Sequence, residues 1–172
     1  MFRIGFGYDV HQLAENRRLV LGGTEIPFHK GTLGHSDGDA LIHAICDALL
    51  GALAMRDIGY HFPDSSSDYK DIDSWILLER TMDLIRNAGW KVSNIDSTIC
   101  LEKPKIKDYI PEMQRVLSQT MGLEPGQVSV KATTTEQLGF VGSGKGVAVY
   151  AVALLMTDDR GKMTADGCQL KV

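Results

Sequence analysis

The sequence predicts an α/β fold, a two-layer α+β sandwich in which helices cover one face of a mixed sheet of four to five strands. Segments with the two-residue period of strands and segments with the 3.6-residue period of helices both occur, without a strict βαβα rhythm. The length of 172 residues, with 44% hydrophobic and 23% charged residues, is typical of one globular domain. We expect that domain over residues 1–156 and a polar, frayed tail over 157–172.

The strands are predicted from alternation and from apolar runs. Residues 2–11 alternate apolar or aromatic side chains with small and polar ones, as in a half-buried strand. Residues 18–23 form a short strand that ends in a turn. Later strands are expected at 90–101, 128–132 and 146–156. The last is almost continuously apolar, which favours a central position in the sheet.

Three helices are predicted from apolar stripes. The first covers residues 37–54, with Ser36 or Asp37 as its N-cap. The second covers 74–88 and the third 108–121, the third with a proline in its first turn and a glycine just past its end. In the second helix the inward side chains are expected to be Trp75, Leu78, Met82 and Ile85. The polar loop over 56–73 is long enough to suggest a functional segment.

Asp9 and His11 are candidate metal ligands. They are two residues apart on a predicted strand, so their side chains share one face. His43, from the first helix, would complete a three-ligand site with one coordination position open, which is the catalytic pattern for zinc. The alternatives are a polar pair at a strand end and a hydrogen-bonded core histidine.

Asp39, His43 and Asp47 follow one another at four-residue spacing on that helix. We expect one of the two carboxylates to hold the ring nitrogen of His43 that does not face the metal, because metal-bound histidines usually have such a partner. The alternative is a row of solvated side chains on the outer helix face.

Two loops could bind phosphate. Thr133-Thr134-Thr135-Glu136 offers hydroxyls and a carboxylate to phosphate oxygens and a hard cation, although a β-branched strand end before a helix would look the same. Residues 139–146 fit the first seven positions of a Walker A loop, but Gly146 stands where Ser or Thr would be needed. A strand, not a helix, is expected to follow, so we reject an ATPase.

Composition excludes further classes of function. The net charge of −4 offers no basic field for nucleic acid. Three cysteines without framework spacing suggest free thiols in a reducing compartment. No signal or transit peptide and no membrane-spanning apolar run are seen, so we expect a cytoplasmic, bacterial protein with no membrane partner.

The chain closely resembles the 2-C-methyl-D-erythritol 2,4-cyclodiphosphate synthase family from about Arg3 to Met156. The resemblance is specific because many short motifs occur in family order. They are Gly-Tyr-Asp-Val-His (7–11), His-Ser-Asp-Gly-Asp (35–39), His43 with Asp47, Asp-Ile-Gly (57–59), Phe-Pro-Asp (62–64), Pro104-Lys105, Lys-Ala-Thr-Thr-Thr-Glu (131–136) and Gly139-Phe140. Ser143 and Lys145 depart from it, since many members carry an arginine and an acidic residue at these positions, which are associated with a cavity on the trimer axis.

The resemblance implies an enzyme, a phosphorus–oxygen lyase of non-mevalonate isoprenoid biosynthesis. It would cyclise 4-diphosphocytidyl-2-C-methyl-D-erythritol 2-phosphate with release of CMP, as a homotrimer with active sites between subunits. Zn²⁺ or another divalent metal would bind Asp9, His11 and His43, and Glu136 would help to hold Mg²⁺ or Mn²⁺ on the substrate diphosphate. His35 and Thr134 would stabilise the transition state. Substrate contacts would come from Ser36, Asp57, Ile58, Gly59, Phe62, Pro63, Asp64, Ser65, Ser66, Leu101, Glu102, Lys103, Pro104, Lys105, Ile106, Lys107, Thr133, Thr135 and Phe140.

Two other functions fit part of the pattern. Two histidines and a carboxylate also describe a non-haem Fe(II) oxygenase, which would have a strand-rich double-stranded β-helix. A metal-stabilised trimeric binding module would keep the fold and the metal but would not release CMP.

Overall fold

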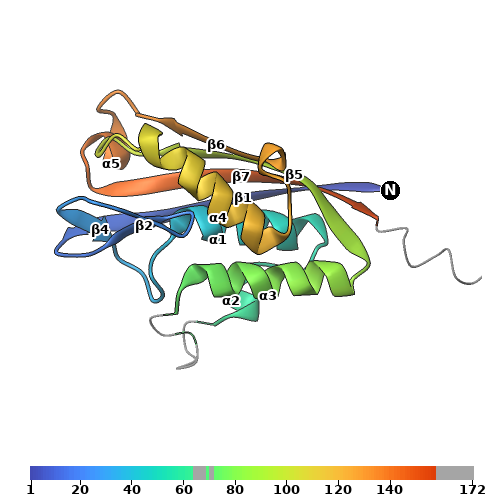
Figure 1. Ribbon diagram of the computed structural model, residues 1–172. Coiled ribbons are helices and arrows are strands. Elements are labelled where there is room, and N and C mark those ends of the chain that lie inside the picture. The colour runs from blue at the N-terminus through green and yellow to red at the C-terminus, as the bar shows by residue number, and fades with distance from the viewer. Residues whose placement is uncertain (64–68, 70–71, 158–172) are drawn as a thin grey trace, which may run out of the picture.

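The computed structural model describes residues 1–63, 69 and 72–157, and it contains the predicted layer of helices on a mixed sheet (Figure 1). Five strands form the sheet, and all neighbours are antiparallel except β5 and β6. Their spatial order is β4 (Lys30–Thr32), β1 (Phe2–Glu15), β7 (Gly146–Thr157), β5 (Trp90–Cys100) and β6 (Val128–Thr133). The predicted fold class is confirmed, and β7 is central, as expected.

Three longer helices pack against the sheet and share one hydrophobic core with it. They are α1 (Ala40–Ala52), α3 (Ser74–Asn87) and α4 (Ile110–Met121). The short elements are the hairpin strands β2 (Leu19–Leu21) and β3 (Thr24–Ile26), the helices α2 (Ile58–His61) and α5 (Gly139–Gly142), and the 3-10 turns η2 (Lys107–Tyr109) and η3 (Pro125–Gln127). None of the described helices is long and apolar enough to cross a membrane.

Helix α1 lies unusually close to strand β1. The two meet at Gly5 and Gly7, where an added Cβ would lie 1.8 Å from the Ala48 carbonyl oxygen and 1.9 Å from that of Ala44. Only glycine permits this approach of backbone to backbone. The helix is buried almost all round, so the pair forms the centre of the core.

The other face of β1 is apolar but exposed. The alternating side chains predicted from the sequence point away from the helices, and those of β7 that pair with them point the same way. Seven of these side chains are between 40% and 71% exposed: Phe2, Ile4, Phe6, Tyr8, Val10, Tyr150 and Val152. The rings of Tyr8 and Tyr150 contact each other in a tilted arrangement, with 5.0 Å between their centroids. The described part of the chain leaves this sheet face uncovered.

Two local predictions were wrong. Helix α1 begins later than expected because Asp39, not Ser36 or Asp37, is its N-cap and accepts hydrogen bonds from the amides of Leu41 and Ile42. Trp75 is 42% exposed, because it lies at the edge of the buried stripe of α3, which is centred on Leu78. The loop before α3 contains the short helix α2. The predicted tail lies outside the described residues, apart from Thr157.

Candidate metal centre and active site

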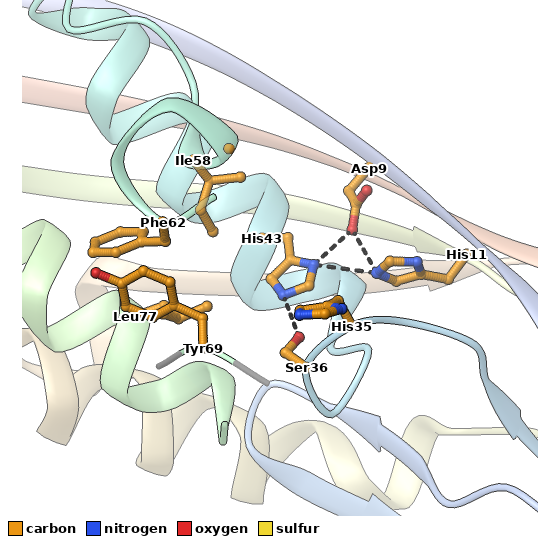
Figure 2. Close-up of a pocket in the computed structure, with 10 residues that line it drawn as sticks. Asp9, His11, His35, Ser36, His43, Ile58, Phe62, Tyr69 and Leu77 are labelled. Carbon is orange, nitrogen blue, oxygen red and sulfur yellow. Dashed lines mark hydrogen bonds and ion pairs between the residues drawn. The ribbon is translucent and has the colours of Figure 1, made fainter. Parts of the chain in front are cut away.

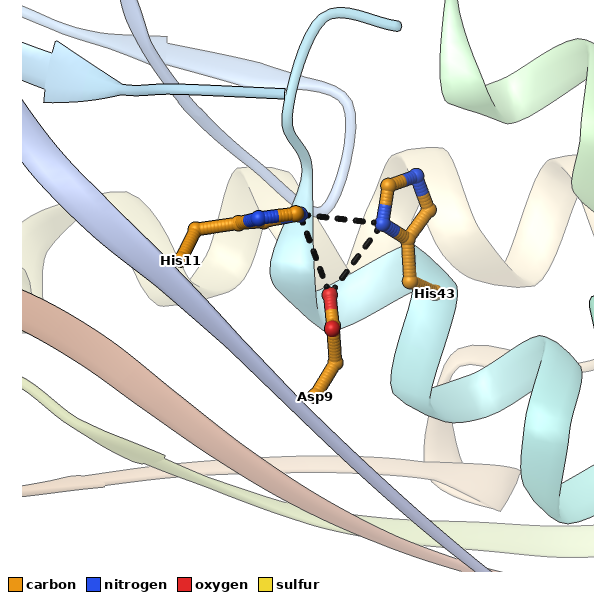
Figure 3. A group of neighbouring side chains, drawn as sticks. All are labelled: Asp9, His11 and His43. Carbon is orange, nitrogen blue, oxygen red and sulfur yellow. Dashed lines mark hydrogen bonds and ion pairs between the residues drawn. The ribbon is translucent and has the colours of Figure 1, made fainter. Parts of the chain in front are cut away.

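Three side chains converge as the sequence predicted. Asp9 Oδ2, His11 Nε2 and His43 Nδ1 form a triangle with sides of 3.1 Å (Figure 3). Among the residues that the structure describes, this is the group of acidic, histidine and cysteine side chains able to hold a metal ion. A carboxylate oxygen and two ring nitrogens facing one point suit a divalent cation, so the site fits a metal.

The fold sets this triangle from two elements. Asp9 and His11 lie on the helix-facing side of β1, the side that also carries Gly5 and Gly7. His43 lies on α1, one turn after its N-cap. Since the glycines let the helix approach the strand, ligands more than thirty residues apart come within hydrogen-bonding distance.

The electrostatics of the metal-free triangle favour positive charge beside Asp9. Burial raises the pKa of Asp9, but hydrogen bonds and the charges of His11 and His43 outweigh it and hold that pKa well below its usual range. Burial lowers the pKa of His43, but the hydrogen bond and charge of Asp9 outweigh it, and the net change is upward. A bound metal ion would stabilise the ionised Asp9 carboxylate in the same way, by placing positive charge beside it.

The outer nitrogen of His43 has hydroxyl partners. Its Nε2 lies 3.0 Å from Ser74 Oγ and 3.2 Å from Ser36 Oγ. The predicted carboxylate partner is therefore wrong for both candidates. Asp39 is fully buried and accepts four amide hydrogen bonds, from Gly22 and Gly23 as well as α1, whereas Asp47 accepts one from the amide of Ile58.

A cavity of about 210 Å³ opens beside the triangle (Figure 2). It joins the metal ligands to other residues that the resemblance assigned to the site. Its lining is Asp9, His11, His35, Ser36, His43, Ile58, Gly59, Phe62, Tyr69 and Leu77. Sequence reasoning missed Tyr69 and Leu77, because an aromatic residue in a polar loop and a leucine on a helix carry no signal for a pocket.

Most of the residues expected around cytosine line a second cavity of about 150 Å³. Its lining is Leu101, Pro104, Lys105, Ile106, Lys107, Ala132, Thr133 and Thr134. Glu102 and Lys103 line a neighbouring cavity with Ser143, and the Glu102 carboxylate accepts a hydrogen bond from the Thr135 amide at 3.4 Å. The cavity beside the metal triangle and the cavity of the residues expected around cytosine share no lining residue, so within a single chain these two groups of expected residues lie apart.

The remaining expected residues have the following places. Glu136 accepts a hydrogen bond from the Thr134 hydroxyl at 2.9 Å and lies outside the metal triangle. Asp57 caps α2, and Pro63 is exposed at the end of that helix. Thr135 and Phe140 line a shallow hollow on the exposed sheet face. Asp64, Ser65 and Ser66 lie outside the described residues.

Comparison with known proteins adds independent evidence. Residues 2–156 match the YgbB family. A 2-C-methyl-D-erythritol 2,4-cyclodiphosphate synthase from Bacteroides fragilis is 58% identical over 153 residues, which cover 89% of this chain and 96% of that protein. The synthase of Syntrophomonas wolfei is 55% identical over 153 residues, or 89% of this chain and 98% of the other.

Solved structures agree with this match. The CDP-bound form of a 2C-methyl-D-erythritol-2,4-cyclodiphosphate synthase superposes with a TM-score of 0.83 at 36% identity, over 90% of this chain and all of that one. A Plasmodium falciparum relative in complex with CDP gives 0.79 at 34% identity, over 91% and 96%. The double-stranded β-helix expected of an Fe(II) oxygenase is excluded by this fold.

Proposed function

The chain belongs to the YgbB family of 2-C-methyl-D-erythritol 2,4-cyclodiphosphate synthases, and on that basis we propose how its residues divide the work of the reaction. The function is cyclisation of 4-diphosphocytidyl-2-C-methyl-D-erythritol 2-phosphate with release of CMP, a lyase step in isoprenoid biosynthesis. The observation that carries this assignment to particular residues is the Asp9–His11–His43 triangle in the wall of a cavity.

Asp9, His11 and His43 would hold Zn²⁺, since one carboxylate and two imidazoles leave a coordination position open. Glu136 would help to hold Mg²⁺ or Mn²⁺ on the substrate diphosphate, supported by its exposed carboxylate beside the Thr134 hydroxyl. When bound, the cations would neutralise charge on the phosphate oxygens and fix their positions.

The reaction needs no general base from the protein. An oxygen of the 2-phosphate is already anionic near neutral pH and attacks the phosphorus nearer the methylerythritol unit. The bond from that phosphorus to the bridging oxygen breaks, and CMP leaves with that oxygen and the electron pair. The protein has to bring anions together in line, so positioning and charge stabilisation account for the catalysis.

Hydroxyl and imidazole donors would serve that purpose. Ser36 Oγ accepts a hydrogen bond from the Gly38 amide and lies 3.2 Å from His43 Nε2, so its own proton can point to a phosphate oxygen in the cavity. His35 lines the same cavity. Together with Thr134 from the second cavity, His35 would stabilise charge on the transferring phosphoryl group.

Cytidine would bind in the second cavity. Its lining offers few side chains with a specific edge for a pyrimidine, so recognition would rely on backbone amides and carbonyls around 101–107. The relatives solved with CDP support a cytidine nucleotide as the ligand. Phe62 and its neighbours in α2 would border the methylerythritol unit.

A homotrimer would join the two parts of the site. The exposed apolar face of β1 and β7 is the kind of surface that a second copy covers. With the metal cavity of one subunit beside the cytidine cavity of the next, each active site would lie between neighbours. Sedimentation analysis should give the trimer mass, and a monomer at working concentration would contradict this arrangement. A cytoplasmic location stays a prediction.

Metal-dependent release of CMP tests the assignment. Wild type should release CMP from the cytidyl substrate, and removal of metal should stop the reaction until zinc and magnesium return. His43→Ala should lose zinc and activity but keep its circular dichroism spectrum. Glu136→Gln should lose most activity and keep its zinc. A wild-type protein that binds CDP without releasing CMP would identify a binding module instead.

A further inference from the structure

We propose that Ser74, held by Asp37, is a positioning residue that fixes the protonation of the His43 ring so that Nδ1 presents its lone pair to the metal site. The inference deepens the proposed function, because it depends on a metal at Asp9, His11 and His43. Neither Ser74 nor Asp37 was expected in the site from the sequence.

The first step is the geometry around Ser74. This side chain is fully buried at the first position of α3. Its hydroxyl donates to Asp37 Oδ1 at 2.5 Å, and its backbone amide donates to Asp37 Oδ2 at 3.0 Å. The bidentate contact fixes the carboxylate and the hydroxyl relative to each other, and it substitutes for the side-chain cap that α3 lacks at Asp73.

The second step is a count of protons. A serine hydroxyl has one proton, and an ionised carboxylate can only accept. With that proton given to Asp37, Ser74 Oγ can only accept from His43 Nε2, which lies 3.0 Å away. The Nε2 atom therefore carries a hydrogen, and once a metal replaces the proton between Nδ1 and the Asp9 carboxylate, Nδ1 carries the lone pair.

The third step is the direction of that lone pair. His43 Nδ1 is the ring atom that lies 3.1 Å from Asp9 Oδ2 and from His11 Nε2. Nδ1 can bind a metal only while unprotonated, and the choice of tautomer is set by the hydrogen bond at the other nitrogen. Many metal-bound histidines donate a hydrogen bond from the outer ring nitrogen directly to a carboxylate. Here the Ser74 hydroxyl lies between the His43 ring and the Asp37 carboxylate and takes that role.

Ser36 does not replace this relay. Its hydroxyl is 3.2 Å from His43 Nε2 and 3.4 Å from Ser74 Oγ, and it has no carboxylate partner in the described part of the chain. A hydroxyl free to turn can either donate to the ring or accept from it. Ser36 alone therefore leaves the tautomer of His43 undetermined, whereas Ser74 does not.

Metal affinity of the purified full chain tests the proposal. Zinc binding is measured by competition with a chelator for wild type, Ser74→Ala, Ser74→Thr and Ser118→Ala. Ser118 is an equally buried serine whose hydroxyl bonds a backbone carbonyl in α4, away from the site. We expect Ser74→Ala to lose about 10- to 100-fold in zinc affinity, Ser74→Thr to recover most of it, and Ser118→Ala to bind as wild type.

A spectroscopic measurement separates positioning from simple support of the helix. In zinc-loaded wild type, ¹⁵N spectra should show His43 protonated at Nε2 and bound through Nδ1. Protonation at Nδ1 would overturn the proposal, as would a folded Ser74→Ala protein with wild-type zinc affinity. If Ser74→Ala does not fold, the wild-type spectrum still decides, because an Nε2 hydrogen that exchanges with water too fast to be observed would show that Ser74 does not hold it. A wild type that binds no zinc would overturn this inference together with the proposed metal site, whereas zinc binding without CMP release would overturn only the proposed activity.

Discussion

The close contact between α1 and β1 makes Gly7→Ala the most informative single change. A methyl group at this position would lie 1.9 Å from the Ala44 carbonyl oxygen, whereas ordinary contact begins near 3.4 Å. The helix must therefore move from the strand by about 1.5 Å, and the obstacle is backbone that cannot rotate away. Overpacking of this kind costs about 3 kcal/mol, the upper end of the usual range.

The same displacement would open the metal triangle. Zinc ligands are held within about 0.2 Å of their preferred distances, so a shift of the helix that carries His43 should lower zinc affinity by more than about 100-fold. Thermal unfolding should show a loss of roughly 6–12 °C in Tm. Zinc content and CMP release should fall together.

Gly51→Ala provides a matched control on the same helix. Its added methyl would meet only the Phe6 carbonyl oxygen, at 3.9 Å. It should stabilise the protein by about 1 kcal/mol through helix propensity and leave zinc binding unchanged. A Gly7→Ala protein with wild-type Tm and zinc affinity would refute the argument that the glycines set the distance between helix and strand.

Two further predictions concern buried charge. Burial, together with the charge of Asp37, raises the pKa of Asp39 to about 6 although backbone amides donate to its carboxylate. The substitution Asp39→Asn places an NH₂ group against the amide of Gly22 or Gly23, so the free energy of unfolding measured by chemical denaturation should fall by about 2–3 kcal/mol. A change below about 0.5 kcal/mol would contradict this prediction. The metal-free protein should lose stability as pH rises, because the pKa of His43 in the folded state lies above its usual value of 6.5. The contact between His43 and Asp9 contributes its full stabilisation below pH 6.5. That stabilisation is lost as the pH rises through the pKa of His43 in the folded state. Because protons compete with zinc for His43, the Tm difference between zinc-loaded and metal-free protein should widen from about pH 6 to about pH 9, and a constant difference would contradict the assignment.

The sequence identified the ligands because their geometry is local. Asp9 and His11 lie two residues apart on a strand, so alternation alone places them on one face, and His43 lies on a helix with a clear apolar pattern. Long-range contacts have no such signature. Ser74 reaches His43 only because the start of α3 packs beside α1, and thirty-one residues separate them.

Periodicity also could not say which face of β1 the helices cover. Alternation distinguishes two faces, and the apolar one is the usual choice for the core. Here the helices cover the face with the glycines and the metal ligands, while Phe6 and Tyr8 stay exposed. Two glycines in alternate positions were the available signal, because small residues mark a close approach by another backbone.

The alternation of β1 also has a consequence for strand pairing. A slip of one residue against β7 would turn Phe6 and Tyr8 toward α1, where not even a methyl group fits. The same slip would carry Asp9 and His11 to the opposite face. Mispaired forms of this strand therefore cannot close over the helix, and only the correct register yields both a sealed core and a metal-binding protein.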